Sequence, residues 1–301
     1  MKNVYLLSGF LGSGKTSLLS HLIKQLKAEG QKPAVIMNEL GKLPFDSRSV
    51  DEDVPIKEML EGCICCTGSE KMEAQLQMLL EGEEFDVLLI ETTGAAHPVE
   101  AMDAVLSPYF ASRLNMKGII TVADCKRWLD RDLMAPQTRM LFLEQIKHAH
   151  LIVANKVDLL SEDEIATVTM QIQGLNSRAA IIQTSEGKLP LNMITSLEAT
   201  FHDQEVKQAA IGKQLSLSSR LHTFLEPVDK EEFEQWVREL PDTIYRMKGY
   251  VPLKGHKNPF LFQYAYGMVQ WLPEYINMEP QIVIIGDQVD SIGILGKASN
   301  D

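Results

Sequence analysis

The sequence predicts an α/β first domain, with a mainly parallel sheet and helices on both of its faces, followed by a small α+β domain. Two observations predict this. In the first two-thirds of the chain, short apolar runs alternate with amphipathic helical stretches, which is the pattern of strands joined by helical crossovers. After Phe201 the pattern changes to a polar stretch, and then to one strand, a helix and three further strands.

The strands of the first domain are expected at short runs of β-branched residues or leucine, because strands buried on both faces read as continuous apolar segments. The predicted strands are Val4–Leu7, Ala34–Met37, Val87–Ile90, Ile119–Val122, Leu151–Ala154 and Ala180–Ile182. A helix is expected after the first of them, where apolar residues stripe one helix face: Leu18, Leu19, Leu22, Ile23 and Leu26.

The second domain is expected at 214–301, after a first domain at 1–201 and a polar linker at 202–213. Asp229 and Glu232 resemble a capping box that opens a helix, and the apolar residues that follow share one face: Phe233, Trp236, Val237 and Leu240. Strands are predicted near Leu215–Phe224 and at Thr243–Leu253, Leu261–Leu272 and Ile282–Ile285.

The composition, with 45% hydrophobic and 23% charged residues, is that of an ordinary soluble globular protein. The formal net charge of −12 argues against nonspecific binding to nucleic acid or to an anionic membrane. No apolar run is long enough to span a bilayer, and polar or glycine positions interrupt the N-terminal run, so no signal peptide is expected. Three of the four cysteines are clustered, which favours a reducing compartment over a disulfide framework. We therefore expect a cytoplasmic protein.

The segment Gly9-Phe-Leu-Gly-Ser-Gly-Lys-Thr16 fits the P-loop pattern and lies between a predicted strand and a predicted helix. Its glycines allow backbone N–H groups to surround nucleotide phosphates, and the helix N-terminus adds positive potential. Lys15 is expected to reach the β- and γ-phosphates, and the Thr16 hydroxyl to coordinate Mg²⁺. The alternative is a chance glycine-rich turn. The predicted nucleotide contacts of this segment are Gly9, Gly12, Ser13, Gly14, Lys15, Thr16 and Ser17.

A second motif, Glu91-Thr-Thr-Gly94, ends the strand Val87–Ile90. An acid at the carboxyl end of a strand beside a P-loop is placed to hold Mg²⁺ or its water, and the Gly94 N–H could approach the γ-phosphate. The other interpretation is a solvated glutamate at a strand end. The predicted catalytic residues are Lys15, Thr16, Glu91 and Gly94.

A third motif, Asn155-Lys156-Val157-Asp158, follows the strand Leu151–Ala154. The Asp158 carboxylate can accept hydrogen bonds from the N1–H and 2-amino edge of guanine, which adenine lacks, so Asn155, Lys156 and Asp158 predict GTP over ATP. This counts against a P-loop kinase of small molecules. Thr184 and Ser185 are candidates to close over the base. The alternative for the tetrapeptide is a plain turn after a strand.

Slow unassisted hydrolysis of GTP to GDP and phosphate is expected, because no glutamine follows Gly94. Signalling GTPases keep a glutamine there to orient the attacking water, and Ala95 and Ala96 stand in its place.

Three thiols at Cys63, Cys65 and Cys66 can converge on one soft cation, and thiolates suit Zn²⁺ or Cu(I) more than Mg²⁺. Structural zinc sites usually take four ligands from two pairs, so three from one loop favour a transfer site. The alternatives are buried small hydrophobes or a redox pair. Cys125, after a strand, is interpreted as structural. His97 could lend a nitrogen, although a lone histidine is more often a hydrogen-bonded loop residue.

Taken together, these residues resemble the CobW family of GTP-dependent metallochaperones, and the resemblance spans nearly the whole chain. The matching segments are the P-loop, Asn38-Glu39-Leu-Gly41 with Asp46, Gly62-Cys-Ile-Cys-Cys66, Glu91-Thr-Thr-Gly94 with Pro98, Asn155-Lys-Val-Asp158, Arg246-Met-Lys-Gly249 and Ile285-Gly286.

The resemblance implies that the Asn-Glu segment is a switch loop, which makes Glu39 a candidate ligand of the transition metal and Asp46 a candidate ligand of Mg²⁺ with Thr16 and Glu91. It implies a GTP-hydrolysing protein that delivers a metal to a client protein, with the client docking partly on the second domain. Zinc is the preferred ion, and Co²⁺, Ni²⁺ and Fe²⁺ stay open. The alternative is a GTP-gated regulatory module whose cysteines are structural or redox-active. A homo-oligomer also stays open.

Overall fold

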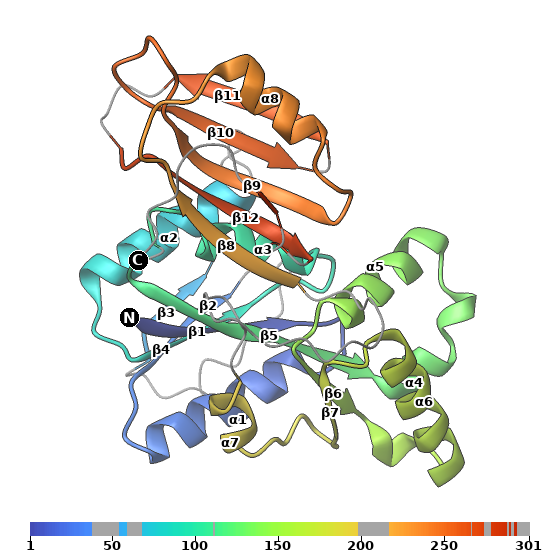
Figure 1. Cartoon of the computed structure of the whole chain (residues 1–301). Coiled ribbons are helices and arrows are strands. Elements are labelled where there is room, and N and C mark those ends of the chain that lie inside the picture. Colours follow the sequence, from blue (N-terminus) through green and yellow to red (C-terminus); the bar gives the residue numbers. More distant parts are fainter. Residues whose placement is uncertain are drawn as a thin grey trace. The chain divides into compact units, whose positions relative to one another are not determined.

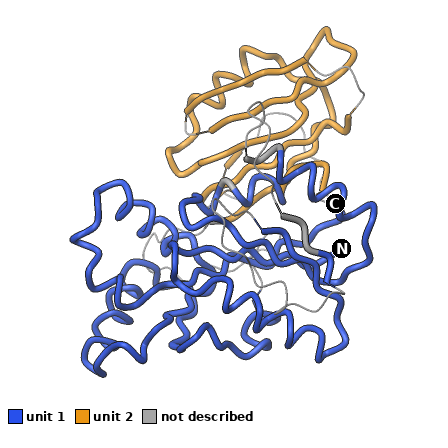
Figure 2. The backbone as a smooth tube through the Cα atoms, turned by 180° about the vertical axis from the view of Figure 1, so that it is seen from behind, with its two compact units in different colours: residues 1–105, 113–199 blue, residues 106–112, 200–301 orange. Residues whose placement is uncertain are grey.

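The computed structural model describes residues 1–37, 54–58, 68–110, 112–197, 217–265, 267–273, 278–287, 289 and 292–293. The chain divides into two compact units (Figure 2). The first unit is Met1–Val105 with Arg113–Ala199, and the second is Leu106–Ser112 with Thr200–Asp301. Among the described residues, no helix combines the length and the apolar character that a membrane crossing needs.

The first unit is built on a seven-stranded parallel sheet with the order β3-β2-β4-β1-β5-β6-β7. This confirms the predicted parallel sheet, and each predicted strand has a counterpart in it. The short β3 was not predicted, because three residues give no readable periodicity. The strands are β1 Lys2–Ser8, β2 Pro33–Met37, β3 Ile56–Glu58, β4 Val87–Glu91, β5 Leu114–Asp124, β6 Leu151–Asn155 and β7 Ala180–Gln183.

Helices cover both faces of this sheet, because alternate residues of each strand point to opposite sides. In β6, Leu151 and Val153 pack on the side of α1 and α7, whereas Ile152 and Ala154 pack on the side of α4, α5 and α6. Figure 1 shows α1 and α7 on one side of the sheet and α2 and α3 on the other. The helices of this unit are α1 Lys15–Ala28, α2 Gly68–Gly82, α3 Pro98–Val105, α4 Cys125–Leu129, η2 Arg131–Leu133, α5 Pro136–Lys147, η3 Val157–Leu159, α6 Glu162–Leu175 and α7 Asn192–Thr195.

The second unit carries a five-stranded antiparallel sheet with the order β11-β10-β9-β12-β8, and one helix, α8, packs on it. The prediction of one strand over Leu261–Leu272 was wrong. The chain reverses at Gly267 (φ 89°), so the segment forms two antiparallel strands. The elements are β8 Leu217–Thr223, α8 Lys230–Arg238, β9 Ile244–Val251, β10 Phe260–Ala265, β11 Met268–Pro273 and β12 Gln281–Asp287.

Helix α8 begins as predicted. Asp229 is its N-cap, and its carboxylate accepts hydrogen bonds from the backbone N–H groups of Glu231 (3.0 Å) and Glu232 (3.3 Å). Phe233 is fully buried and meets the Phe262 ring edge to face at a centroid distance of 5.0 Å. The apolar face of α8 thereby closes one side of the antiparallel sheet.

Gly249 is required by the packing of β9 against β12. A Cβ at this position would lie 2.1 Å from the backbone oxygen of Gln281 and 2.5 Å from the Ile282 Cα. Backbone atoms cannot move aside as a flexible side chain can, so we expect Gly249→Ala to lower the melting temperature of the protein. In a domain of this size, each loss of about 1 kcal/mol from the free energy of unfolding lowers the melting temperature by about 4 °C or more. Thermal unfolding by circular dichroism measures this.

The matched control is Gly255→Ala, since a Cβ at Gly255 meets nothing within 4 Å. Gly255 has φ 83°, so this variant measures the cost of a left-handed backbone alone. A Gly249→Ala protein that melts at the wild-type temperature would contradict the steric explanation.

Candidate nucleotide and metal site

The P-loop lies at the centre of the first sheet, where β1 ends between β4 and β5. Its three glycines, Gly9, Gly12 and Gly14, all have positive φ, with values of 135°, 74° and 105°. A Cβ at Gly9 would lie 2.3 Å from the Val122 backbone oxygen, so the loop turns directly over β5. This curved backbone followed by α1 is the arrangement that binds phosphates.

Lys15 is 6% exposed, and its ammonium group donates to the backbone oxygens of Gly9 (2.9 Å) and Phe10 (3.4 Å). The P-loop backbone thus surrounds the Lys15 ammonium group, which we expect to bind phosphate. Ser13 is fully buried, whereas Ser17 is exposed in the first turn of α1.

The Thr16 hydroxyl donates a 3.0 Å hydrogen bond to the Glu91 carboxylate, although 75 residues separate them in sequence. Glu91 is 4% exposed, and its place in the β4 ladder opposite Leu7 brings it to the P-loop. A hydroxyl and a carboxylate side by side offer the oxygen ligands that Mg²⁺ prefers, so this pair fits the predicted ion.

The segment after Glu91 is held against the P-loop and against α5. Thr92 donates to the backbone oxygen of Leu7 through both its N–H (3.0 Å) and its hydroxyl (3.2 Å). A Cβ at Gly94 would lie 2.5 Å from the Leu11 backbone nitrogen, so only glycine allows this approach. Buried Gln145 donates from its Nε2 to the backbone oxygens of Gly94 (3.2 Å) and Ala96 (3.3 Å).

Asn155 joins three parts of the site. Its Nδ2 donates to the Ser13 backbone oxygen at 2.7 Å, and its Oδ1 accepts from the Gly187 N–H at 3.0 Å. Asn155 is 2% exposed, and a Cβ at Gly14 would lie 2.4 Å from its Nδ2. The side chain therefore fixes the P-loop relative to the turn after β7.

Lys156 is in the left-handed region (φ 64°), and its ammonium group pairs with Asp124 at 2.7 Å. The other oxygen of Asp124 accepts from the Arg127 N–H at 3.0 Å and caps α4. The Arg127 guanidinium in turn donates to the Leu11 backbone oxygen at 2.8 Å and lies 5.0 Å from the Phe10 ring centroid. This network supports the tip of the P-loop.

Asp158 is exposed in the 3-10 turn after Lys156. The pKa of Glu186 lies below its ordinary value because Lys188 bonds its carboxylate, and the nearby charge of Asp158 opposes that shift. The charge of Asp158 is thus near enough to the turn after β7 to act on Glu186. Thr184, proposed to close over the base, begins this turn, and its N–H donates to Ala154 at 2.9 Å.

The predicted ligands Glu39, Asp46, Cys63, Cys65 and Cys66 lie outside the described residues. Cys125 is buried, and burial followed by the nearby Asp124 charge raises the pKa of its thiol to about 12. A thiol with this pKa stays protonated, which supports the structural interpretation of Cys125.

Sequence reasoning missed three contributors to the site: Asp124, Gln145 and Gly187. Asp124 could have been found, because it ends a strand beside Asn155 in the β5–β6 ladder, as Glu91 ends β4. Gln145 and Gly187 carry no local signal, since they reach the site from a helix and a turn through tertiary packing.

Comparisons with known proteins agree with this geometry. The family model described as CobW/HypB/UreG, nucleotide-binding domain, matches residues 3–183, and that of the cobalamin synthesis protein cobW C-terminal domain matches residues 217–295. A crystal structure of a Zn(II)-bound triple mutant of the YjiA GTPase superposes with a TM-score of 0.55 at 25% identity, over 96% of this chain and 95% of that one.

Two curated relatives illustrate the range of coverage. Zinc-regulated GTPase metalloprotein activator 1 of Schizosaccharomyces pombe is 36% identical over 206 residues, which cover 65% of this chain and 49% of that protein. The zinc chaperone YjiA of Escherichia coli is 30% identical over 277 residues, which cover 86% of this chain and 85% of that protein. The chain therefore spans about half the length of the first relative and most of the length of the second.

Replacing Asn155 tests the connection that it makes. Asn155→Ala leaves the Ser13 oxygen and the Gly187 N–H without this partner, which typically costs about 1–3 kcal/mol of folding free energy for each buried group. We expect a lower denaturation midpoint and weaker nucleotide binding, measured by urea unfolding and by fluorescent-nucleotide titration.

Asn115→Ala is the matched control, because Asn115 bonds Asn3 at 3.2 Å near the opposite end of the strands. Nucleotide affinity should fall in the Asn155 variant and stay at the wild-type value in the Asn115 variant. An equal change in both would show that Asn155 has no special role at the P-loop.

Proposed function

Because the chain belongs to the CobW/HypB/UreG family, we propose that it is a GTP-hydrolysing metallochaperone that delivers a transition-metal ion, zinc foremost, to a client protein. The observation that carries the nucleotide half of this proposal is the meeting of three motifs at one edge of the sheet. Thr16 bonds Glu91 at 3.0 Å, and Asn155 bonds the P-loop at 2.7 Å.

In this proposal the P-loop backbone binds the phosphates, Lys15 moves from the loop carbonyls to phosphate, and Asp158 selects guanine. Thr16 and Glu91 hold Mg²⁺, with Asp46 as a further ligand, and the ion neutralises charge on the transferred phosphoryl group. Gly94 aims its N–H at the γ-phosphate. Ala95 and Ala96 provide no side chain to orient water, which supports a slow intrinsic rate.

The metal half of the proposal rests on Cys63, Cys65 and Cys66, with Glu39 as a fourth ligand. The names of the relatives, zinc chaperone and zinc-regulated GTPase metalloprotein activator, support zinc as the cargo. We also propose a cytoplasmic location, domain limits of 1–201 and 214–301 about a linker at 202–213, and a client contact that includes the second domain. The net charge of −12 supports a protein partner over nucleic acid or an anionic membrane.

We propose that nucleotide and metal communicate through α2 and β4. The three cysteines Cys63, Cys65 and Cys66 (the cysteine run) end two residues before α2. Helix α2 leads into β4, which ends at Glu91. A γ-phosphate that contacts Gly94 would therefore act on the segment after β4, while Mg²⁺ would act on Glu91 at the end of the same strand. The alternative, a GTP-gated regulatory module with structural or redox-active cysteines, shares the nucleotide site but predicts no such coupling.

Asp158→Asn tests the base assignment. The amide replaces a carboxylate that pairs with the guanine edge, so we expect GTP affinity to fall at least about 100-fold, while affinity for xanthosine triphosphate rises. The control is Asp163→Asn, an exposed acid in the first turn of α6. Wild-type protein that binds ATP and GTP equally would refute the assignment.

Metal titrations of the apo, GDP-bound and nonhydrolysable-GTP-bound forms test the coupling. We expect Zn²⁺ affinity to differ between nucleotide states by about 5–150-fold, and bound Zn²⁺ must change GTP affinity by the same factor. The variant Cys63→Ser/Cys65→Ser/Cys66→Ser should lose the part of this difference that the cysteine ligands carry. Identical affinities in all three states would leave a GTPase without a chaperone cycle.

A further inference from the structure

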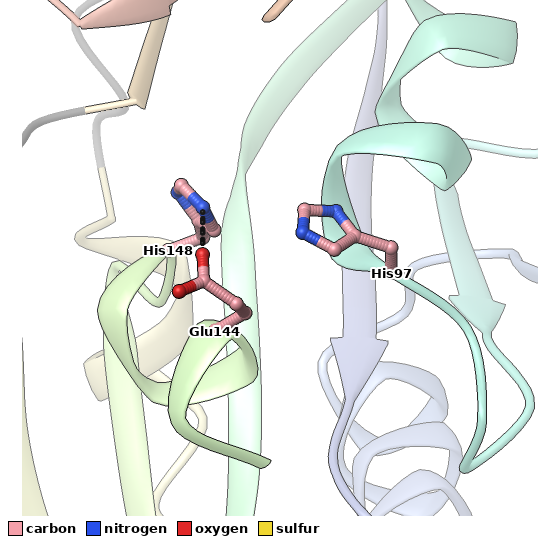
Figure 3. Close-up of side chains that lie close together, drawn as sticks. All are labelled: His97, Glu144 and His148. Carbon is pink, nitrogen blue, oxygen red and sulfur yellow. Dashed lines mark hydrogen bonds and ion pairs between the residues drawn. The ribbon is translucent and has the colours of Figure 1, made fainter. Parts of the chain in front are cut away.

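Three side chains that the proposed function does not use converge on one point in the first unit. His97 comes from the loop just before α3, and Glu144 and His148 come from the end of α5 (Figure 3). One ligand atom from each lies within 4.8 Å of the others. We propose that these residues form a second metal site, for one Zn²⁺ or a similar borderline divalent ion, separate from the cysteine run.

The donor set suits such an ion, because two imidazoles and a carboxylate match the ligands that zinc takes in proteins. The His148 Nε2 and a Glu144 oxygen are 3.1 Å apart. Ligands at ordinary zinc distances in a tetrahedral site are separated by about 3.4 Å. This pair is therefore already spaced for an ion. The His97 ligand atom lies within 4.8 Å of the other two, so it needs to approach them by about 1.4 Å at most.

The carboxylate is held in its charged form and in a fixed direction. Its other oxygen pairs with the Lys147 ammonium group at 2.7 Å. The hydrogen bond from His148, together with Lys147, lowers the pKa of Glu144 to about 2, although burial opposes the shift. An ion bound to the His148 Nε2 would replace that hydrogen bond, whereas the Lys147 contact would stay in place. A ligand carboxylate anchored by a second group is the usual arrangement around protein-bound metals.

Burial and helix geometry also favour an ion here. The His148 side chain is 4% exposed and the Glu144 side chain is 26% exposed, so the cluster is shielded but reachable. Residues four apart on a helix lie on one face, which brings Glu144 and His148 together without strain. They sit at the carboxyl end of α5, where the helix dipole stabilises positive charge.

His97 connects the site to the nucleotide-facing loop. Its Nδ1 accepts a 3.3 Å hydrogen bond from the Val99 N–H, so Nε2 is the ligand atom and carries the ring proton before metal binds. Coordination through Nε2 moves this proton to Nδ1 and breaks the bond to Val99. His97 follows Gly94 by three residues, and Gln145 holds that segment against α5. A bound ion would thus add a second connection between α5 and the loop of Gly94 and His97, beside the Gln145 hydrogen bonds.

The site is tested in the whole 301-residue chain with Cys63, Cys65 and Cys66 all changed to serine, so that the result does not depend on those three cysteines. Co²⁺ serves as the probe, since its visible spectrum reports coordination number and a thiolate charge-transfer band reports cysteine ligands. We expect one equivalent of Co²⁺, displaced by Zn²⁺, with no thiolate band. Absence of stoichiometric binding would overturn the proposal even if the cysteine run binds metal in the wild type.

Two further changes in this background identify the ligands. His97→Asn and Glu144→Gln should each weaken Co²⁺ binding at least about tenfold, whereas His256→Asn, at an exposed histidine of the second unit, should leave it unchanged. Thermal melts without metal show that each variant is folded, and the near-isosteric Glu144→Gln keeps the volume of the side chain. Unchanged affinity in folded Glu144→Gln and His97→Asn proteins would place the ion elsewhere and refute the site.

Discussion

The site depends on the parallel register between β1 and β4. Leu7 lies opposite Glu91 in this ladder, so the strand that leads into the P-loop and the strand that ends in the acid finish at the same level. Only then can the Thr16 hydroxyl reach the Glu91 carboxylate at 3.0 Å. A slip of one residue would turn Glu91 to the other face of the sheet, because side chains alternate along a strand.

A second constraint is that the loops at this edge are bonded to one another rather than to solvent. Asn155 connects the P-loop to the turn after β7, and Arg127 supports the loop tip through Leu11. The segment after β4 is held on two sides, by the Leu7 backbone oxygen and by Gln145. A ligand that displaces one of these loops must therefore break specific hydrogen bonds. This favours two discrete arrangements of the loops over a gradual deformation.

Most of the first sheet could be predicted from sequence, because buried parallel strands are continuous apolar runs. The first part of β5 was not predicted, because it is not a continuous apolar run. Asn115 and Lys117 alternate with buried residues there, and Gly118 lies where the register to β1 shifts. The turn at Gly267 was not predicted, because apolar residues continue on both sides of it. At the site, motif residues could be read directly, whereas Gln145, Glu144 and His148 lie on a helix whose position only tertiary packing defines. The placement of Glu39, Asp46 and the cysteines is still a prediction.

Both proposed sets of metal donors are next in sequence to helices that pack on each other. The cysteine run precedes α2 and His97 precedes α3, and α2 and α3 are packing partners in the first unit. Between them in sequence lies β4, which ends at Glu91 and is followed by Gly94. In the proposed function, Mg²⁺ would act at Glu91 and the γ-phosphate at Gly94. A displacement of the loop that contains Gly94 and His97 would move the start of α3, and through it the helix that follows the cysteines. Packed helices transmit such shifts because a dense interior cannot absorb them locally. If Mg²⁺ and the γ-phosphate act at the end of β4 as proposed, β4 with its two flanking helices would connect nucleotide state to both proposed sets of metal donors.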